Sequence, residues 1–218
     1  MQIGNADSPA PRRRVLNLLL VGNPYDAFLL EDAGFLAGEP DVAKEVPSFE
    51  LVRSGKKALR RLEEGCFDLI LVDLMLPDMP GVELAAKVRR LYPDLPAVVI
   101  TSNTDIGGSS ATTGGEQVPD LFIWYGAPEL LRALVKLKED ELNAPTLARD
   151  QHSLVILLVE DEPNFYSHFV PVLYERIRES AIGLLPRADR PDTPWEVLDN
   201  RPLVLLRRNF EDACEVLY

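Results

Sequence analysis

The sequence predicts an α/β fold, in which helices cover both faces of a parallel sheet. Short apolar runs alternate with helical patterns over residues 14–142. The runs are continuously apolar, which is typical of strands buried on both faces. One run ends in a carboxylate, Asp73, and a turn with Pro77, Pro80 and Gly81 follows it. Ligand sites in open α/β sheets lie at such strand ends.

The first part of the pattern alternates three strands with three helices. Gly22-Asn23-Pro24 is a turn signal after the first apolar run, and Ser54-Gly55 is a start signal for a helix. In chain order we expect a strand at Val15–Val21, a helix at Tyr25–Ala37, a strand at Phe49–Val52, a helix at Lys56–Glu64, a strand ending at Asp73 and a helix at Val82–Leu91.

The second part adds two strands. We expect strands at Ala97–Thr101 and Leu121–Tyr125, and a final helix at Pro128–Leu142. The intervening segment, Asn103–Gln117, is rich in Gly and Ser, so it is a poor helix and is expected to be a mobile loop. It lacks the Lys-Ser/Thr of a nucleotide-binding loop. The sequence therefore predicts a doubly wound, five-stranded parallel sheet.

After this pattern the chain starts a second, shorter one. We expect a disordered arm at residues 1–13, the first domain at 14–142, a linker at 143–152 and a truncated second α/β unit at 153–218. We expect this unit to need the first domain, or a swapped partner, to bury its strands. Its expected elements are a strand at Ser153–Val159, a helix at Asn164–Ser180, a strand at Pro202–Leu206 and the start of a helix at Phe210–Tyr218.

Composition limits the classes of function. The 218 residues carry a formal charge of −12, and both parts of the chain are acidic, so no nucleic-acid partner is expected. The basic run Arg12–Arg14 is interpreted as a solvated tail. Cys66 and Cys214 stand alone, as in proteins of a reducing compartment. No signal peptide and no apolar run of membrane-spanning length is present, which predicts a cytoplasmic protein without a membrane partner.

The segment around Asp73 resembles the phosphoacceptor segment of response regulator receiver domains. An apolar strand, Leu69–Val72, precedes the Asp; a Pro follows four residues later and a Gly eight residues later. The resemblance implies a flavodoxin-like fold and a phosphoryl group accepted by Asp73 from a sensor histidine kinase or phosphotransfer protein. It assigns the switch hydroxyl to Thr101. The implied function is two-component signal transduction by a phosphorelay.

The same resemblance implies a Mg²⁺ site that differs from the family pattern in this chain. Family members hold the ion with the acceptor Asp, here Asp73, with the carbonyl of the residue at Met75, and with an acidic pair after the first strand. That pair is Gly22-Asn23 here. Neutral Asn23 could offer one oxygen, so Mg²⁺ should bind weakly.

The lysine that family members carry after the fifth strand is also replaced, because Trp124 and Tyr125 stand there. Two interpretations of Asp73 therefore remain open. Either it is a working phosphoacceptor, or the domain is a pseudo-receiver that docks a partner without phosphorylation. We also expect that the helix from Pro128 could pack on a second copy, which would make a homodimer.

The second unit carries an acidic pair of its own, Glu160 and Asp161, directly after its first strand. The pair matches the metal-binding pair of the family; the alternative is an acidic cluster at a helix start, which the helix dipole favours. Together with Phe165-Tyr166-Ser167, it is similar to the N-terminal region of large bacterial proteins that carry a pyruvate-phosphate-dikinase-like module.

Enzymatic alternatives find little support in the sequence, and we expect no enzyme. A dehalogenase-type phosphatase would need a second Asp where Met75 stands. A dinucleotide-binding site would need a Gly-rich turn after the first strand. His152 and His168 have no evident Cys or Ser partner for nucleophilic catalysis.

Overall fold

The computed structural model describes residues 13–22, 47–105, 112–113, 116–117, 120–127, 129–147, 154–183 and 201–217. The expected arm at residues 1–13, apart from Arg13, and the expected helix at Tyr25–Ala37 lie outside these residues.

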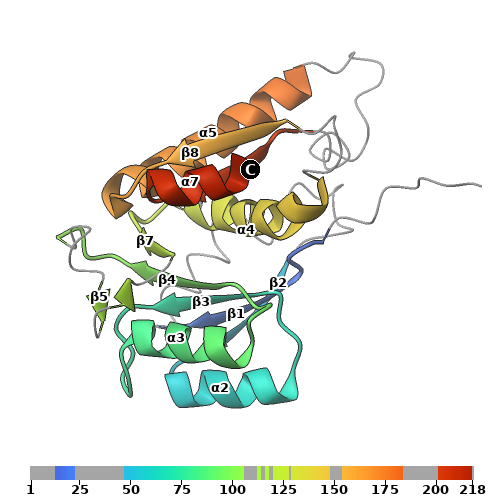
Figure 1. Cartoon of the computed structure of the whole chain (residues 1–218). Helices are drawn as coiled ribbons and strands as arrows, with labels where there is room; N and C mark the ends of the chain where they lie inside the picture. The colour runs from blue at the N-terminus through green and yellow to red at the C-terminus, as the bar shows by residue number, and fades with distance from the viewer. Residues whose placement is uncertain are drawn as a thin grey trace, which may run out of the picture.

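Five parallel strands form the main sheet, in the order β2-β1-β3-β4-β7 (Figure 1). Without the short β5 and β6, this is the order 2-1-3-4-5 of doubly wound flavodoxin-like folds, which confirms the predicted fold class. The strands are β1 (Asn17–Val21), β2 (Ser48–Val52), β3 (Leu69–Asp73), β4 (Ala97–Thr101) and β7 (Leu121–Ile123).

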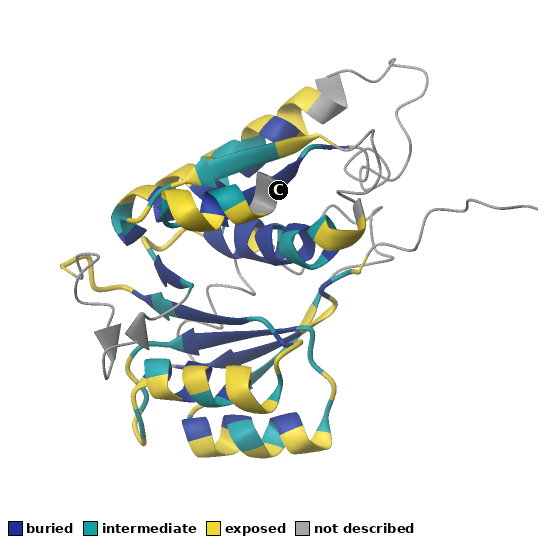
Figure 2. Cartoon of the chain, viewed as in Figure 1, coloured by how far each residue is buried: buried dark blue, intermediate teal, exposed yellow. Residues whose placement is uncertain are grey.

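Alternate residues of the central strands belong to two hydrophobic clusters, one on each face of the sheet. In β1, Leu19 and Val21 point to the cluster under α2 (Gly55–Glu64) and α3 (Gly81–Leu91). Leu18 and Leu20 point to the opposite cluster, which includes α4 (Glu129–Leu147). Burial on both faces explains why these strands are continuously apolar (Figure 2).

Between β4 and β7 the structure differs from the expected mobile loop. Thr112–Thr113 (β5) and Glu116–Gln117 (β6) form a short antiparallel pair. The fifth strand of the sheet ends at Ile123, two residues earlier than expected. Its last ladder bond joins Trp124 N to Thr101 O at 2.7 Å, and Gly126 then turns the chain with a φ of 81°.

The expected linker at 143–152 also differs, because α4 continues to Leu147. Asn143 explains the extension. It is buried, and its side chain donates to the carbonyls of Arg13 at 2.8 Å and Glu139 at 2.7 Å, while its Oδ1 accepts from Arg13 N at 2.7 Å. These bonds tie the last turns of α4 to the segment that leads into β1.

Residues 154–217, the C-terminal unit, contain a second pair of parallel strands. β8 (Val155–Val159) pairs with β9 (Leu203–Arg207) over five residues, and α5 (Pro163–Gly183) connects them. A last helix, α7 (Phe210–Leu217), contacts both strands. The unit stacks on α4, so α4 lies between the two sheets (Figure 1).

Each unit closes a free sheet edge of the other with a helix. α5 of the C-terminal unit covers the outer edge of β7: Ser167 Oγ accepts from Ile123 N at 2.9 Å, and the Tyr166 hydroxyl donates to the Leu121 carbonyl. Burial raises the pKa of Tyr166 to about 12, which keeps this donor protonated. In return α4 covers the outer edge of β9, where Asp140 Oδ2 accepts from Val204 N at 2.9 Å.

Asp140 is the most heavily bonded of these side chains. Besides Val204 N, it accepts two bonds of 2.7 Å from the Arg201 guanidinium and one of 2.7 Å from the Tyr174 hydroxyl. Both Asp140 and Arg201 are buried, so the pair is shielded from water. Burial and the neighbouring Asp140 carboxylate raise the pKa of Tyr174. These contacts join α4, α5 and β9.

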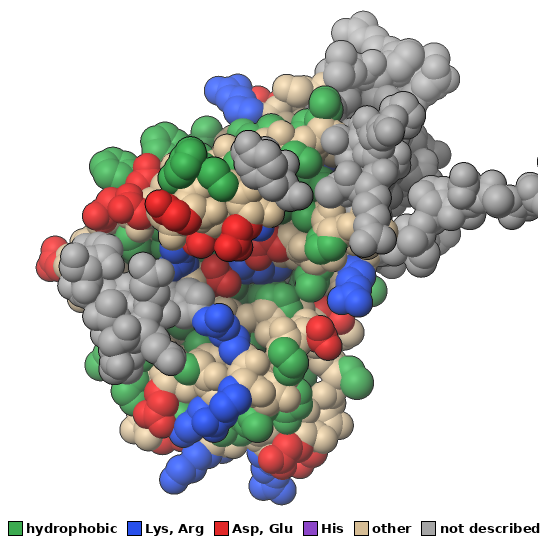
Figure 3. Space-filling view, viewed as in Figure 1, with side chains coloured by type: hydrophobic (Ala, Val, Ile, Leu, Met, Phe, Trp, Pro, Cys, Tyr) green, Lys and Arg blue, Asp and Glu red, His purple; other side chains and the backbone are tan. Residues whose placement is uncertain are grey.

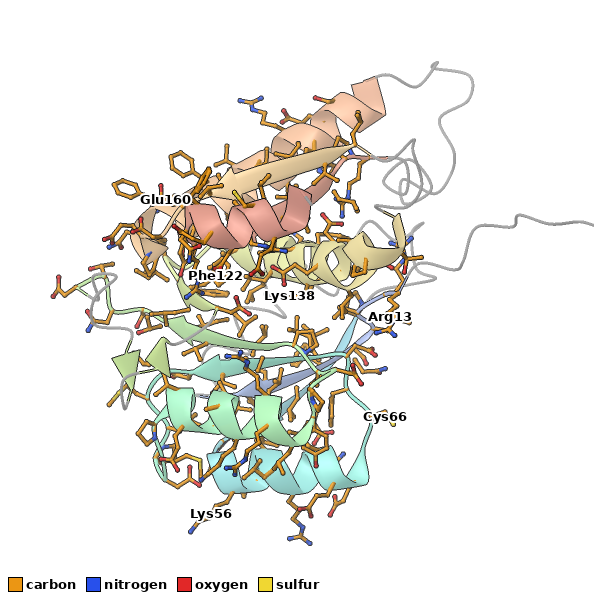
Figure 4. The ribbon with its side chains drawn as sticks, in the orientation of Figure 1. Arg13, Lys56, Cys66, Phe122, Lys138 and Glu160 are labelled. Atoms are coloured by element: carbon orange, nitrogen blue, oxygen red, sulfur yellow. The ribbon has the colours of Figure 1, made fainter. Side chains whose placement is uncertain are left out.

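A second buried ion cluster lies two residues earlier on α4, at Lys138. Lys138 Nζ lies 3.0 Å from Asp120 Oδ2 and 2.7 Å from Glu141 Oε2, between α4 and the residue that leads into β7 (Figure 4). Burial lowers the pKa of Lys138, but the two carboxylates outweigh it and the net shift is upward. Lys138 is therefore charged at every physiological pH.

The helix that we expected to pack on a second copy is thus used within the chain. Its apolar residues Leu130, Leu131 and Leu134 share one continuous cluster with Val204 and Leu206 of β9. The N-terminal domain and the C-terminal unit therefore have a common core.

Asp140→Ala should lower the free energy of unfolding by about 3–5 kcal/mol, because it leaves the buried Arg201 without its carboxylate partner. Urea denaturation of the full chain measures this. Asp94→Ala, which changes an exposed aspartate, is the control and should change it by less than about 0.5 kcal/mol. Equal effects of the two substitutions would contradict the role assigned to Asp140.

Candidate functional site

The structure places Asp73 at the carboxyl end of β3, in the centre of the sheet, where its side chain is half-buried. Its Oδ1 accepts from Met75 N at 3.0 Å, while the other oxygen has no hydrogen-bond donor among the described residues. Leu74 N still donates to the Ile100 carbonyl of β4 at 2.8 Å. The carboxylate is thus fixed by its own turn and keeps one oxygen open.

Gly81 holds the turn after Asp73 against the strand. Its N–H donates to the Leu74 carbonyl at 2.8 Å, and a Cβ at this position would lie 2.0 Å from the Asp73 carbonyl oxygen. No side chain fits there without a shift of the backbone. The spacing of Asp and Gly in the sequence thus has a steric cause.

Asp78 connects the same turn to the next helix. Its two carboxylate oxygens accept from Gly55 N at 2.9 Å and Lys56 N at 3.0 Å, at the start of α2. These backbone donors lower the pKa of Asp78. Asp78 therefore caps a helix that lies outside its own segment.

Thr101 lies at the end of β4, next to the strand that carries Asp73. Asp73 pairs with Ile100, the residue before Thr101, so the two polar residues occupy neighbouring strand ends. Thr101 is buried, and its Oγ1 accepts from Asn103 N at 3.1 Å. Because the oxygen accepts this bond, the hydroxyl hydrogen is left to donate elsewhere.

The end of β7 carries aromatic residues in place of a cation. Tyr125 donates its hydroxyl to Asn164 Oδ1 at 2.9 Å, and its ring contacts the His168 ring at a tilt of 49°, with ring centroids 4.1 Å apart. Asn164 Nδ2 in turn donates to the Thr104 carbonyl at 3.4 Å. The start of α5 is thereby tied to two loops of the site, while Trp124 packs against the core beneath.

The described residues fit a Mg²⁺ ion only in part. Asp73 offers one carboxylate and Met75 one backbone carbonyl, and Asn23 lies outside the described residues. In the described part of the chain no three Asp, Glu, His or Cys side chains form a metal-binding group. Two oxygen donors are too few for tight binding, because Mg²⁺ requires near-octahedral coordination.

Glu160 and Asp161 lie at the carboxyl end of β8, directly before α5 (Figure 4). Glu160 Oε1 accepts from Glu162 N at 3.0 Å, and Glu160 N donates to the Arg207 carbonyl at 2.9 Å. This carboxylate thus bonds the backbone just before the helix. A metal-binding role for the pair remains a prediction from the sequence.

Residues 42–112 match the family model of the response regulator receiver domain, and these residues include β2, β3, β4 and the site around Asp73. This part of the chain is a response regulator receiver domain. Its curated relatives include the response regulator receiver protein CpdR of Brucella abortus, which is 42% identical over 48 residues, 22% of this chain and 40% of CpdR.

Another relative is the aerobic respiration control sensor protein ArcB of Escherichia coli, 39% identical over 59 residues, which are 26% of this chain and 8% of ArcB. The matched segments thus span less than half of each relative. Among solved structures, a CheY-like receiver domain protein from Methanospirillum hungatei superposes with a TM-score of 0.46 at 23% identity, over 60% of this chain and 98% of that one.

Several residues that organise this receiver domain were not found in the sequence. The sequence did not identify Asp78 as a helix cap, because the backbone groups that it caps lie more than twenty positions earlier in the chain. Tyr166 and Ser167 were recognised as part of a motif, but not as caps of β7. Both lie one turn before Val170, on the buried side of α5, and this helical spacing was the signal that could have identified them.

Gly81→Ala should lower the free energy of unfolding by about 1–3 kcal/mol, because the new methyl group overlaps the backbone at Asp73. Thermal and urea denaturation measure the loss. Gly65→Ala is the matched control, since its Cβ would meet the Phe67 ring at 3.2 Å at a backbone conformation open to any residue. A smaller loss for Gly81→Ala than for Gly65→Ala would refute the steric argument.

Asp78→Ala should cost about 0.5–2 kcal/mol at neutral pH, the usual value of a helix cap. The folded pKa of Asp78 is below the value near 4 of a free aspartate, so its contribution is present above pH 4 and disappears as the pH falls through the folded pKa. Stability curves of wild type and variant should therefore converge in acid. A constant difference down to the lowest accessible pH would show that the carboxylate charge is not involved.

Proposed function

We propose that the chain acts in two-component signalling and that its receiver domain accepts a phosphoryl group on Asp73. The donor would be the phosphohistidine of a sensor histidine kinase or of a phosphotransfer protein. The open carboxylate oxygen of Asp73, at a central strand end beside Thr101, is the observation that supports this best. The bond from Met75 N to the other oxygen holds the carboxylate in place.

In the proposed transfer, the open oxygen of Asp73 forms a bond to phosphorus as the phosphorus–nitrogen bond of the donor breaks. The bonding electron pair stays on the imidazole, which leaves with a proton from solvent. The Thr101 hydroxyl, whose hydrogen is free to donate, would then bond a phosphoryl oxygen. The rest of the catalysis is positioning and charge neutralisation.

Charge neutralisation is the weak part of this site. The residues after β7 supply no cation, and only Asp73 and Met75 are described as donors for Mg²⁺. When bound, Mg²⁺ would reduce the repulsion between carboxylate and phosphoryl group. We therefore propose slow phosphorylation that requires a high Mg²⁺ concentration.

A second candidate function is a pseudo-receiver that binds a partner without phosphorylation. It is favoured by Tyr125, which occupies the region where the family carries its lysine and is bonded to Asn164 of the C-terminal unit. In this alternative the N-terminal domain and the C-terminal unit form one constitutive binding surface. The likeness to pyruvate-phosphate-dikinase-like proteins would then describe a regulatory part of a larger protein.

We place the protein in the cytoplasm, where phosphohistidine donors of such systems present their transmitter domains. Among the described helices, none has the length and apolar character needed to cross a bilayer. The acidic charge supports a protein partner rather than nucleic acid.

The test is the intact mass of the protein after incubation with acetyl phosphate over a Mg²⁺ series. We expect one added phosphoryl group on wild type and on Asp94→Asn, and none on Asp73→Asn. Asn23→Asp should lower the Mg²⁺ concentration that gives half of the adduct, because a second carboxylate joins the metal donors.

Absence of the adduct in every variant, including Asn23→Asp, would overturn phosphorylation and support the pseudo-receiver. An adduct that persists in Asp73→Asn would place the acceptor elsewhere. An adduct on wild type that does not depend on Mg²⁺ would contradict the proposed charge argument.

A further inference from the structure

The five-stranded sheet and the β8–β9 sheet have four edges, and among the described residues three of these are protected against pairing with another chain. α5 closes β7 and α4 closes β9 with side-chain hydrogen bonds. β2 carries Glu50, which pairs with Arg61, and charged residues on an edge strand disfavour association. β8 is the fourth edge. Among the described residues, neither a covering helix nor a charged side chain on the strand protects it.

The direction of each peptide group in β8 follows from its ladder with β9. Leu203 N donates to the Leu154 carbonyl at 2.8 Å, and Glu160 N donates to the Arg207 carbonyl at 2.9 Å, so the even-numbered residues of β8 face β9. The odd-numbered residues Val155, Leu157 and Val159 therefore direct both N–H and C=O to the free edge. Among the described residues nothing pairs with these six backbone groups of β8, so they can take an added strand.

The side chains around this edge are apolar. β8 reads Val-Ile-Leu-Leu-Val without a charge, and its end residues Val155 and Val159 are 43% and 47% exposed. Phe165 and Phe169, which follow on α5, are also exposed, and hydrophobic side chains gather over this part of the molecule (Figure 3). An apolar edge of this kind is a template for strand addition.

We propose that β8 pairs with β8 of a second copy of this chain, antiparallel and about a two-fold axis at Leu157. In this register Val155 of one copy faces Val159 of the other, and Leu157 faces its own symmetry mate. The three outward-facing residues of each copy are then all in hydrogen-bonded pairs, so six backbone bonds join the two strands. The two β8–β9 pairs become one four-stranded sheet.

Two features favour a second copy in this orientation. The strand is nearly the same when read in reverse, so each apolar side chain meets one of similar size across the axis. Glu160, Asp161 and Glu162 follow β8 at its carboxyl end, and a parallel pair would bring the two acidic clusters together. The antiparallel pair separates them to opposite ends.

The proposed dimer is independent of phosphorylation, because β8 belongs to the C-terminal unit and its edge needs no change at Asp73. Backbone bonds with a few apolar side chains make a small interface, so we expect dissociation in roughly the micromolar range. The dimer should form equally in wild type and Asp73→Asn.

Sedimentation velocity of the full chain over a dilution series tests this proposal with paired charge variants. V155K/V159K places like charges opposite each other at both ends of the strand pair and should raise the dissociation constant at least ~tenfold. V155K/V159E places opposite charges together in the antiparallel register and should restore the dimer. In a parallel register both double variants would repel.

L157P gives an independent check. Its N–H points to the free edge, so proline in both copies removes both bonds at the axis without removing one to β9. We expect a monomer with an unchanged circular dichroism spectrum. A monomeric wild type, a V155K/V159K variant that dimerises like wild type, or a V155K/V159E variant that stays monomeric would each overturn the proposal. If the wild type is monomeric, the remaining candidate partner of β8 is a strand from a different protein.

Discussion

The structure depends on one constraint: the edge strands β7 and β9 must be closed. Each presents unpaired N–H and C=O groups to a buried interface, and a buried unpaired polar group costs about 1–3 kcal/mol. Ser167 and Tyr166 satisfy β7, and Asp140 satisfies β9. Because the helix of one unit closes the sheet of the other, neither unit can be removed without exposing an edge.

This reciprocal closure explains the unusual polarity of α4. A helix between two sheets would normally be apolar all round, yet Lys138, Asp140 and Asn143 are all buried on it. Each has partners from a different segment, and together they fix the entry into β1, the start of β7 and β9. Buried ion pairs contribute little net stability, but they disfavour every packing that leaves them unpaired. The apolar cluster stabilises the fold, and the buried polar residues of α4 fix how the two sheets are positioned on this helix.

The sequence predicted the sheet well because the signal for each central strand is local. A continuous apolar run identifies a strand that is buried on both faces, and the spacing from Asp73 to Gly81 identifies the turn that needs a residue without a side chain. The positions of Asp73 and Thr101 at neighbouring strand ends were predictable to the same extent, while the roles assigned to them remain predictions. The two residues are neighbours because their strands, β3 and β4, are adjacent in the sheet. Strands that follow one another in a chain of alternating strands and helices are usually adjacent.

What the sequence did not predict depends on partners far along the chain. Asn143 was read as linker, and only its bonds to Arg13, 130 positions earlier, show why α4 continues past it. Asp140 was not singled out in the sequence, because its partners Arg201 and Val204 lie 61 and 64 positions later. Capping of a strand edge by side chains of a distant helix leaves no periodic pattern.

The same contacts limit how strongly Asp73 can influence the C-terminal unit. The described connection runs from the loop after Thr101 through the Thr104 carbonyl to Asn164, which Tyr125 also binds. Both bonds are exposed, and a hydrogen bond of this kind contributes about 0.5–1.5 kcal/mol net. Breaking both could couple the site to α5 by roughly 1–3 kcal/mol, a shift of about 5–150-fold in population. The deeper bonds of α5 to β7 would stay intact, so a signal from Asp73 would move the start of α5 rather than detach the C-terminal unit.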